Sequence, residues 1–343
     1  MTRQKKRTQR RRASSARRGG VVAPSGGRST TSPPRVKVST PADLLGLVPY
    51  LLGFCPQESL VVLLIRDSAV LLTARVDIPP VEATVPLIEQ FAGLAERHKA
   101  SGMVLFAYSE DAASARELVE GLVAGLERHG LLDALYVAAD RWWSLMCDQA
   151  CCPAEGTPYD LSTHPMAAEA VFAGLTAAPG RSAVEALVSG PPADDLDRLV
   201  EVSRQVSAEL VDLGLAERQE LMAAAVRGAL VHPQPLSDAD CARFAMLAAD
   251  VQVRDVAWAL ISRADADRHV HLWGQVVART IAPFEPAVLC LLGMAAWISG
   301  NGALQNCCAD RAARIDPTYS MTGLLEEINQ RALPPSFWDA MST

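Results

Sequence analysis

The sequence predicts an α/β domain, a mixed sheet with crossover helices, followed by an all-α domain with tetratricopeptide-like helical hairpins. Between residues 35 and about 150, β-rich runs alternate with amphipathic segments of helical length. Beyond Pro153 the strand patterns fade and helical spacing continues toward the C-terminus. Half of the 343 residues are apolar, which is enough for two domains with cores of their own.

Three segments follow from this pattern. Residues 1–34 are mostly Arg, Ser, Gly and Pro and cannot bury a core, so they are expected to form a disordered basic arm. Pro191-Pro192 is the best candidate for a domain boundary. We therefore expect an α/β domain at 35–190 and a helical domain at 191–343.

In the first domain, Thr40 can cap a helix that begins at Pro41 and ends near Gly53, with Pro49 expected to kink or shorten it. The runs 59–66 and 70–77 predict an antiparallel hairpin. A helix at 84–99, a strand at 102–108, a helix at 112–129 and a strand at 133–139 follow, and 142–146 is a candidate edge strand. Helices between strands imply crossovers and local parallel pairing.

The helical spacing in the second half predicts ten helices. Two precede the boundary, at 165–175 and 181–189, and eight follow it, at about 193–213, 217–230, 238–249, 252–263, 266–281, 285–299, 301–315 and 318–331. A 34-residue repeat, the tetratricopeptide period, relates Ala259, Ala278 and Pro283 to Gly293, Ala312 and Pro317. The aromatic positions of that repeat are missing, which favours a compact helical domain over a solenoid.

Charge divides the chain sharply. Residues 1–38 carry twelve basic and no acidic side chains, whereas the rest carries 20 basic and 39 acidic ones, a net charge of −19. The arm is therefore expected to make weak, non-specific contacts with nucleic acid, although it lacks aromatic residues for base stacking. The alternative is a solubilising extension without a partner.

Several function classes lack their signals. No apolar run is long enough for a membrane helix, and no apolar segment follows Arg17-Arg18 as a signal peptide requires, so we expect a cytoplasmic protein with mostly reduced cysteines. The phosphate-binding motifs GxxxxGK[ST] and GxGxxG are missing from the positions where they bind nucleotides. No histidine forms a recognisable nucleophile–base pattern with Cys55 or Ser59.

Residues 41–62, PADLLGLVPYLLGFCPQESLVV, form the most distinctive stretch. Together with later short motifs, this stretch resembles an uncharacterised bacterial family, domain of unknown function 4192. The later motifs are Arg75-Val76-Asp77, Arg141-Trp142-Trp143, Cys147, Cys152-Pro153, Ala296-Trp297, Gly300 and Asp316-Pro317-Thr318-Tyr319. The resemblance covers residues from about 36 to 335 and implies no activity, cofactor or catalytic residue.

One candidate site is a cluster of thiols. Cys147, Cys151 and Cys152, with His164 a dozen residues later, are a candidate structural zinc set, although the spacing differs from the usual C-x2-C. The alternative is a redox pair formed by two of the thiols, which requires a nearby positive charge that lowers one thiol pKa. The remaining interpretation is a loop of reduced cysteines that act as small apolar groups.

The second candidate is a row of acidic residues after successive strands: Asp77, Glu110 with Asp111, and Asp140. Carboxylates at the carboxyl ends of strands could hold Mg²⁺ or act as acid and base. Arg75 and Arg141 could bind an anionic substrate or neutralise those acids. Alternatively, 109–111 caps a helix and Asp140 forms a turn.

Two hypotheses about function follow. The favoured one is a cytoplasmic interaction or scaffold protein that binds a protein partner through an apolar groove between helices at about 252–315 in the second domain. No catalytic set assembles from the sequence, which favours this hypothesis. The other is an enzyme, metal- or thiol-dependent, with its site at the strand ends. Its cofactor is unknown, and zinc is the one that the sequence suggests.

Overall fold

The computed structural model describes residues 20–22, 35–38, 40–138, 140–147 and 152–341. The N-terminal half contains twelve helices and strands: β1 (Gly20–Val22), β2 (Arg35–Lys37), α1 (Pro41–Leu52), β3 (Ser59–Arg66), β4 (Ala69–Asp77), α2 (Thr84–Arg97), β5 (Gly102–Tyr108), α3 (Ala112–Leu126), β6 (Leu131–Val137), β7 (Arg141–Ser144), β8 (Thr157–Pro158) and α4 (Pro165–Phe172). Short 3₁₀ turns at Val81–Ala83, Glu127–His129 and Leu161–Thr163 join some of them.

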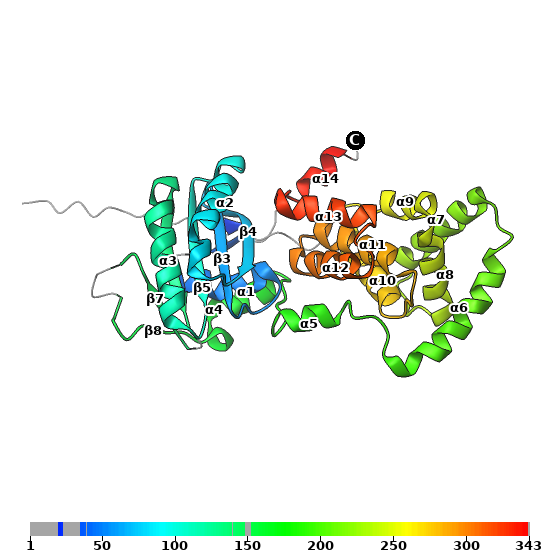
Figure 1. Ribbon diagram of the computed structural model, residues 1–343, viewed down its shortest axis with the longest axis horizontal. Helices are drawn as coiled ribbons and strands as arrows, with labels where there is room; N and C mark the ends of the chain where they lie inside the picture. The colour runs from blue at the N-terminus through cyan, green and yellow to red at the C-terminus, as the bar shows by residue number, and fades with distance from the viewer. Residues whose placement is uncertain (1–19, 23–34, 39, 139, 148–151, 342–343) are drawn as a thin grey trace, which may run out of the picture.

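Six of the strands form one mixed sheet in the order β4-β3-β5-β6-β7-β8 (Figure 1). The predicted antiparallel hairpin is present as β3 and β4, and β3 also runs antiparallel to β5. The β5–β6 pair is parallel because α3 carries the chain back between them, whereas β7 and β8 return antiparallel. The expected mixed sheet with crossover helices is confirmed.

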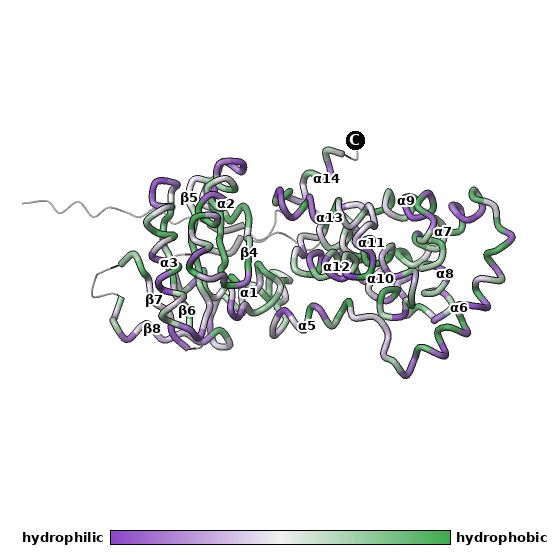
Figure 2. The backbone as a smooth tube through the Cα atoms, in the orientation of Figure 1, coloured by the Kyte–Doolittle hydropathy of each residue, from purple (hydrophilic) through white to green (hydrophobic). Residues whose placement is uncertain are grey.

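Both faces of the central strands are covered. Alternate side chains of β3 face opposite layers, so Leu60, Val62 and Leu64 pack with α2 and α3, while Val61 and Leu63 pack on the side of α1. Burial on both faces requires apolar residues at nearly every position, which produces the hydrophobic interior of this half in Figure 2.

Helix α1 begins where the sequence predicts it. Thr40 and Asp43 form a capping box, and Gly53 ends the helix with a φ of 83°. The helix runs three residues beyond Pro49 to Leu52. Since a proline has no N–H for the carbonyl four residues earlier, the oxygen of Leu45 accepts a hydrogen bond from the Tyr159 hydroxyl instead, at 3.1 Å.

Most of the predicted basic arm, 1–34, lies outside the described residues. Within it the structure departs from the expected disorder at Gly20–Val22, because this segment forms β1 and pairs antiparallel with β2. Backbone hydrogen bonding to a neighbouring strand can order a segment whose composition offers no core residues.

The C-terminal half is built of helices only: α5 (Arg181–Ala186), α6 (Leu196–Leu210), α7 (Leu215–Val231), α8 (Asp238–Ala249), α9 (Val251–Ala259), α10 (Ala266–Val277), α11 (Glu285–Ser299), α12 (Gly302–Ile315), α13 (Ser320–Gln330) and α14 (Ser336–Met341), with a 3₁₀ turn at Ala193–Asp195. All ten predicted helices from α4 to α13 are present. The sequence missed α14, whose Trp338 stacks on Trp258 and donates a hydrogen bond to the carbonyl of Ile261.

Helix α11 lies at the centre of this half (Figure 1). It contacts α8, α9, α10, α12 and α13, and the residues from Pro286 to Ile298 are all buried. Gly293 lets α12 and α13 come close, because a Cβ there would lie 3.2 Å from the Cβ of Cys308 and 2.8 Å from the side chain of Leu325. The arrangement is a helical layer around one buried helix.

Segment α5 connects the two halves. Ala178, just before it, forms a parallel bridge with Phe54, and Arg181 pairs with Asp310 of α12 at 2.8 Å. Arg311, also on α12, pairs with Glu285 and donates to the carbonyl of Val188. Among the described residues, the helices are too short or too polar for any of them to cross a membrane.

Candidate functional site

The sheet brings the predicted strand ends to one edge. In the strand register, Asp77 of β4 lies beside Ser59 of β3, Ser59 beside Tyr108 of β5, and Tyr108 beside Val137 of β6. The residues that follow β5 and β6 therefore emerge at the same edge, where ligands commonly bind in parallel sheets. This part of the sequence prediction is confirmed.

The chain's own Glu58 occupies the centre of this edge. One carboxylate oxygen accepts a hydrogen bond from the Ser109 hydroxyl at 2.8 Å, and the other accepts from the backbone N–H of Glu110 at 2.9 Å. Glu58 has a positive φ of 40°, a conformation that non-glycine residues rarely adopt. A carboxylate thus already lies where the start of α3 would attract an anion.

Arg75 and Asp77 neutralise each other at the outer strand. The Arg75 guanidinium lies 2.5 Å from a carboxylate oxygen of Asp77 and donates to the Ser59 hydroxyl at 2.9 Å. It also lies over the ring of Phe54. Of the two roles considered for Arg75, the structure shows the neutralising one.

Of the acidic residues that follow β5, Asp111 caps the next helix. It caps α3 by accepting hydrogen bonds from the N–H groups of Ala113 and Ser114 at 3.2 Å. The Ser114 hydroxyl and N–H stabilise the charged form, which lowers the pKa of this exposed carboxyl below its ordinary value. The N-cap interpretation is confirmed for this residue.

Asp140 and Arg141 belong to a different set of contacts. The Asp140 side chain is exposed, and its backbone carbonyl accepts from the N–H of Tyr159 at 2.7 Å. The Arg141 guanidinium donates to the carbonyls of Glu155 and Gly156. The polar contacts of Arg75 with Asp77 and of Arg141 with the 155–156 carbonyls are separate, so a joint site of the three acidic residues and two arginines stays a prediction.

A polar hollow of about 240 Å³ lies beside β7 and the cysteine loop. Its lining includes Arg116, Trp143, Cys147 and Cys152. The Arg116 guanidinium lies 5.2 Å from the ring centres of both Tyr136 and Trp143. These two rings are themselves stacked, so cation and rings form one rigid group.

The zinc prediction is only partly within the described residues. His164 caps α4, since its Nδ1 accepts from the N–H of Met166 at 3.2 Å, and it packs against Gly46 of α1. In the part of the chain that the structure describes, no three His, Cys, Asp or Glu residues are grouped as metal ligands require. Cys151 lies outside that part, so the full set of Cys147, Cys151, Cys152 and His164 stays a prediction.

A second hollow, of about 260 Å³, lies in the helical half between the end of α7, the segment 233–236 and α10. We call it the α7–α10 groove. Its floor is apolar, and its rim carries Gln234, Asp267, Arg268 and His271; the remaining lining residues are Ala229, Pro233, Leu236, Leu272 and Gln275. It differs from the predicted groove at 252–315 because its second wall is α7 rather than α11 or α12.

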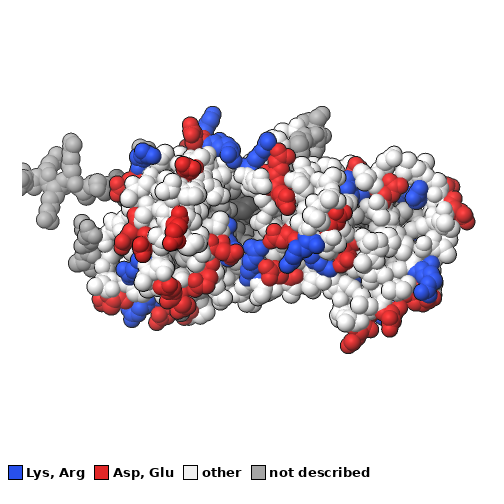
Figure 3. Space-filling model, in the orientation of Figure 1, with Lys and Arg blue, Asp and Glu red and all other residues white. Residues whose placement is uncertain are grey.

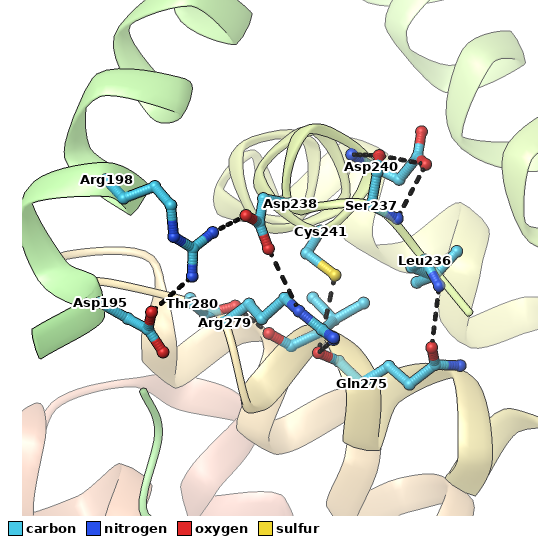
Figure 4. Close-up of polar contacts among 11 residues, drawn as sticks. Asp195, Arg198, Leu236, Ser237, Asp238, Asp240, Cys241, Gln275, Arg279 and Thr280 are labelled. Carbon is cyan, nitrogen blue, oxygen red and sulfur yellow. Dashed lines mark hydrogen bonds and ion pairs between the residues drawn. The ribbon is translucent and has the colours of Figure 1, made fainter. Parts of the chain in front are cut away.

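Polar contacts fix the walls of this groove (Figure 4). The Gln275 side chain of α10 accepts from the backbone N–H of Leu236 at 2.9 Å, and its carbonyl accepts from the Cys241 thiol at 3.6 Å. Asp238, at the start of α8, pairs with Arg198 of α6 and with Arg279, two residues beyond the end of α10. These contacts hold the 233–236 segment and the start of α8 against α10, on the side of the groove opposite α7.

Sequence reasoning missed the residues that organise both hollows. Glu58 lies in the 41–62 stretch without an assigned role, and neither Arg116 nor Gln275 stands in a motif. The signal for the polar hollow in the sequence is the pair Trp142-Trp143 followed by cysteines, since both tryptophans, Cys147 and Cys152 line the hollow. The groove residues are ordinary helix and turn residues, so only the packing of α7 against α10 reveals them.

Comparisons with known proteins agree with the resemblance seen in the sequence. Residues 41–336 match the family described as a domain of unknown function (DUF4192), and the chain belongs to that family. Neither the curated proteins nor the solved structures contain a match.

Proposed function

We propose that this member of a family without an assigned activity is an interaction protein that binds an apolar side chain of a partner protein in the α7–α10 groove. The observation that carries the proposal is the groove itself, an apolar floor of Ala229, Leu236 and Leu272 under a polar rim. A concave apolar surface with a few polar groups around it is the usual form of a peptide-anchoring pocket.

The fixed walls support this proposal. Gln275 holds the 233–236 segment to α10, and Asp238 joins the start of α8 to α6 and to Arg279 just after α10, so this side of the groove is ordered before a partner arrives. A preformed site spends less of its binding free energy on ordering side chains and loops. The volume of about 260 Å³ suits one large apolar side chain rather than a whole helix.

Peptide selection on the purified full chain tests the proposal. Displayed random peptides should be enriched for sequences with one large apolar anchor, and their affinities can be measured by fluorescence anisotropy with synthetic peptides. Ala229→Trp, which fills the groove, should weaken binding at least about tenfold. Ala224→Trp, on the exposed side of the same helix, should leave binding unchanged.

Two results would contradict the proposal. One is the lack of any enriched apolar anchor among the selected peptides. The other is equal affinity of the selected peptides for the Ala229→Trp and Ala224→Trp variants, which would place the binding surface elsewhere.

The enzyme hypothesis now centres on the polar hollow. It is supported by Cys147 and Cys152 on its lining and by the nearby Arg116 guanidinium. It lacks Asp77 and Asp140 among its lining residues. Metal analysis of the reduced protein, compared with a Cys147→Ala, Cys152→Ala variant, tests the zinc version, and metal content equal in both would end it.

The basic arm remains a proposed contact for nucleic acid. The ten positive charges of residues 1–34 oppose the surplus of acidic side chains on the rest of the chain, which Figure 3 shows on the N-terminal half. Removal of residues 1–34 should abolish low-salt retention on nucleic acid, and unchanged retention would refute the idea.

A cytoplasmic location and a tetratricopeptide-like α11–α12 hairpin are likewise proposals. The hairpin is supported by the close approach of the helices at Gly293.

A further inference from the structure

The most exposed large apolar side chain that the structure describes is Phe172, at the end of α4. It is 96% exposed, and its neighbour Val171 is 59% exposed. Gly174 turns the chain back directly afterwards with a φ of 86° and donates its N–H to the carbonyl of Val171. Phe172 and Val171 therefore form a small exposed apolar surface at an ordered helix end, which is available for contact with another apolar surface.

The surroundings of Phe172 and of the α7–α10 groove match in chemistry. Glu169 lies three residues before Phe172, one helical turn away, and is exposed. Arg268 is exposed on the rim of the groove, which also carries His271 and Asp267. When Phe172 of one copy enters the groove of another, the Glu169 carboxylate one turn away can pair with Arg268.

The two surfaces lie in different halves of an elongated molecule (Figure 1). Helix α4 is part of the sheet-containing half, whereas α7 and α10 lie in the helical half beyond α5. A ring and a groove separated in this way cannot meet within one chain but can meet between two. Such a contact joins unlike surfaces, so two copies either exchange it reciprocally in a twofold dimer or pass it on from copy to copy.

We propose that the partner of the α7–α10 groove is a second copy of this chain, which inserts Phe172 into the groove and pairs Glu169 with the groove's Arg268. This inference rests on the proposed function, since it names the partner of the same groove. The contact is small, so the association is weak and reversible.

Sedimentation velocity of the full chain over a range of concentrations measures the association. The weight-average sedimentation coefficient of the wild type should rise between about 10 and about 300 µM, the range of a weak contact. Phe172→Ala and Ala229→Trp should each weaken self-association at least about tenfold. Val85→Ala, which truncates another exposed apolar residue on α2, is the matched control and should change nothing.

Charge reversal tests the pairing of the two surfaces. Glu169→Arg and Arg268→Glu should each lower the association, because like charges then face each other across the contact. Both changes in one chain should restore it, since every copy presents both surfaces. A double variant no better than either single variant would overturn the pairing.

Mixing the two apolar variants gives the sharpest result. Phe172→Ala keeps a groove and Ala229→Trp keeps a ring, so the mixture should form heterodimers that grow no further. A wild type that stays monomeric throughout, or a Phe172→Ala variant that associates like the wild type, would overturn the inference. The peptide selection described above is independent of this result, so the groove would then keep its function with a different partner.

Discussion

The edge of the sheet and the α7–α10 groove differ in how open they are to a ligand. The sheet edge is where parallel strands commonly present a binding crevice, yet here Glu58 accepts the hydrogen bonds of Ser109 and Glu110. The groove does not lie at a position that commonly binds ligands, but its apolar floor is open and its 233–236 wall is fixed to α10 through Gln275. A position that commonly binds ligands in a fold therefore indicates a site only if its hydrogen-bonding groups are not already paired within the chain.

The cysteines of the two halves differ in their burial. Cys290 and Cys308 are buried in the helical half, where burial raises the pKa of each thiol and keeps it protonated. Cys147 and Cys152 are only half-buried and line the polar hollow. Thiol reactivity should therefore concentrate in the sheet-containing half.

The largest expected effect comes from Gly156→Ala. This residue has a φ of 82°, and an added Cβ would lie 2.4 Å from the Trp143 ring. Displacing that ring breaks its stack with Tyr136 and Arg116, and we expect a loss of about 3 kcal/mol in the free energy of unfolding, measured with urea.

Gly174→Ala is the matched control for this change. Gly174 has a similar φ of 86° but has no atom within 4 Å of the added Cβ, so only the cost of the left-handed conformation remains, about 1 kcal/mol. Equal losses in the two variants would show that Trp143 is not held by this contact.

Glu58→Ala tests whether the sheet edge is filled by its own carboxylate. The Ser109 hydroxyl and the Glu110 N–H lose their acceptor, and the free energy of unfolding should fall by about 1–2 kcal/mol. Glu58→Gln, which keeps an acceptor oxygen, should lose less in the same urea titration. If Glu58→Ala were as stable as the wild type, the edge would be open to ligands after all.

Gln275→Leu tests whether this side chain holds the 233–236 segment against α10. It removes the acceptor for the Leu236 N–H, so we expect a loss of about 1 kcal/mol and faster hydrogen exchange at that amide. Asn329→Leu in α13, a side-chain amide bonded to Asn306 away from the groove lining, should leave exchange at Leu236 unchanged. Unaltered exchange in Gln275→Leu would mean that packing alone holds the groove wall.

The smallest expected effect is a pH dependence in the helical half. His269 is fully buried, and burial lowers the pKa of its imidazole below the ordinary value. The unfolded chain therefore binds the proton more readily, so stability is full above the ordinary histidine pKa and declines as the pH falls through it. His269→Gln should flatten this decline, whereas an unchanged pH profile in urea would assign it to other groups such as His98, whose pKa burial also lowers.

The elements were predictable because local patterns decide them. Thr40 and Gly53 delimit α1, and the β-rich runs become β3 and β4 with boundaries within a residue. The contacts of the site were not, because they join residues distant in sequence: Glu58 meets Glu110, and Leu236 meets Gln275. Periodicity carries no information about which surfaces of two helices leave a groove between them, and the short α14 has too few residues for a periodic signal.

Helix α11 has a consequence for how the chain is made. From Pro286 to Ile298 every residue is buried, so the helix has no side that water would accept. Its cover comes from α8 to α10, which are synthesised earlier, and from α12 and α13, which follow it. As the nascent chain leaves the ribosome, α11 therefore emerges with half of its enclosure missing, and the helical half can close only after α13 has been translated.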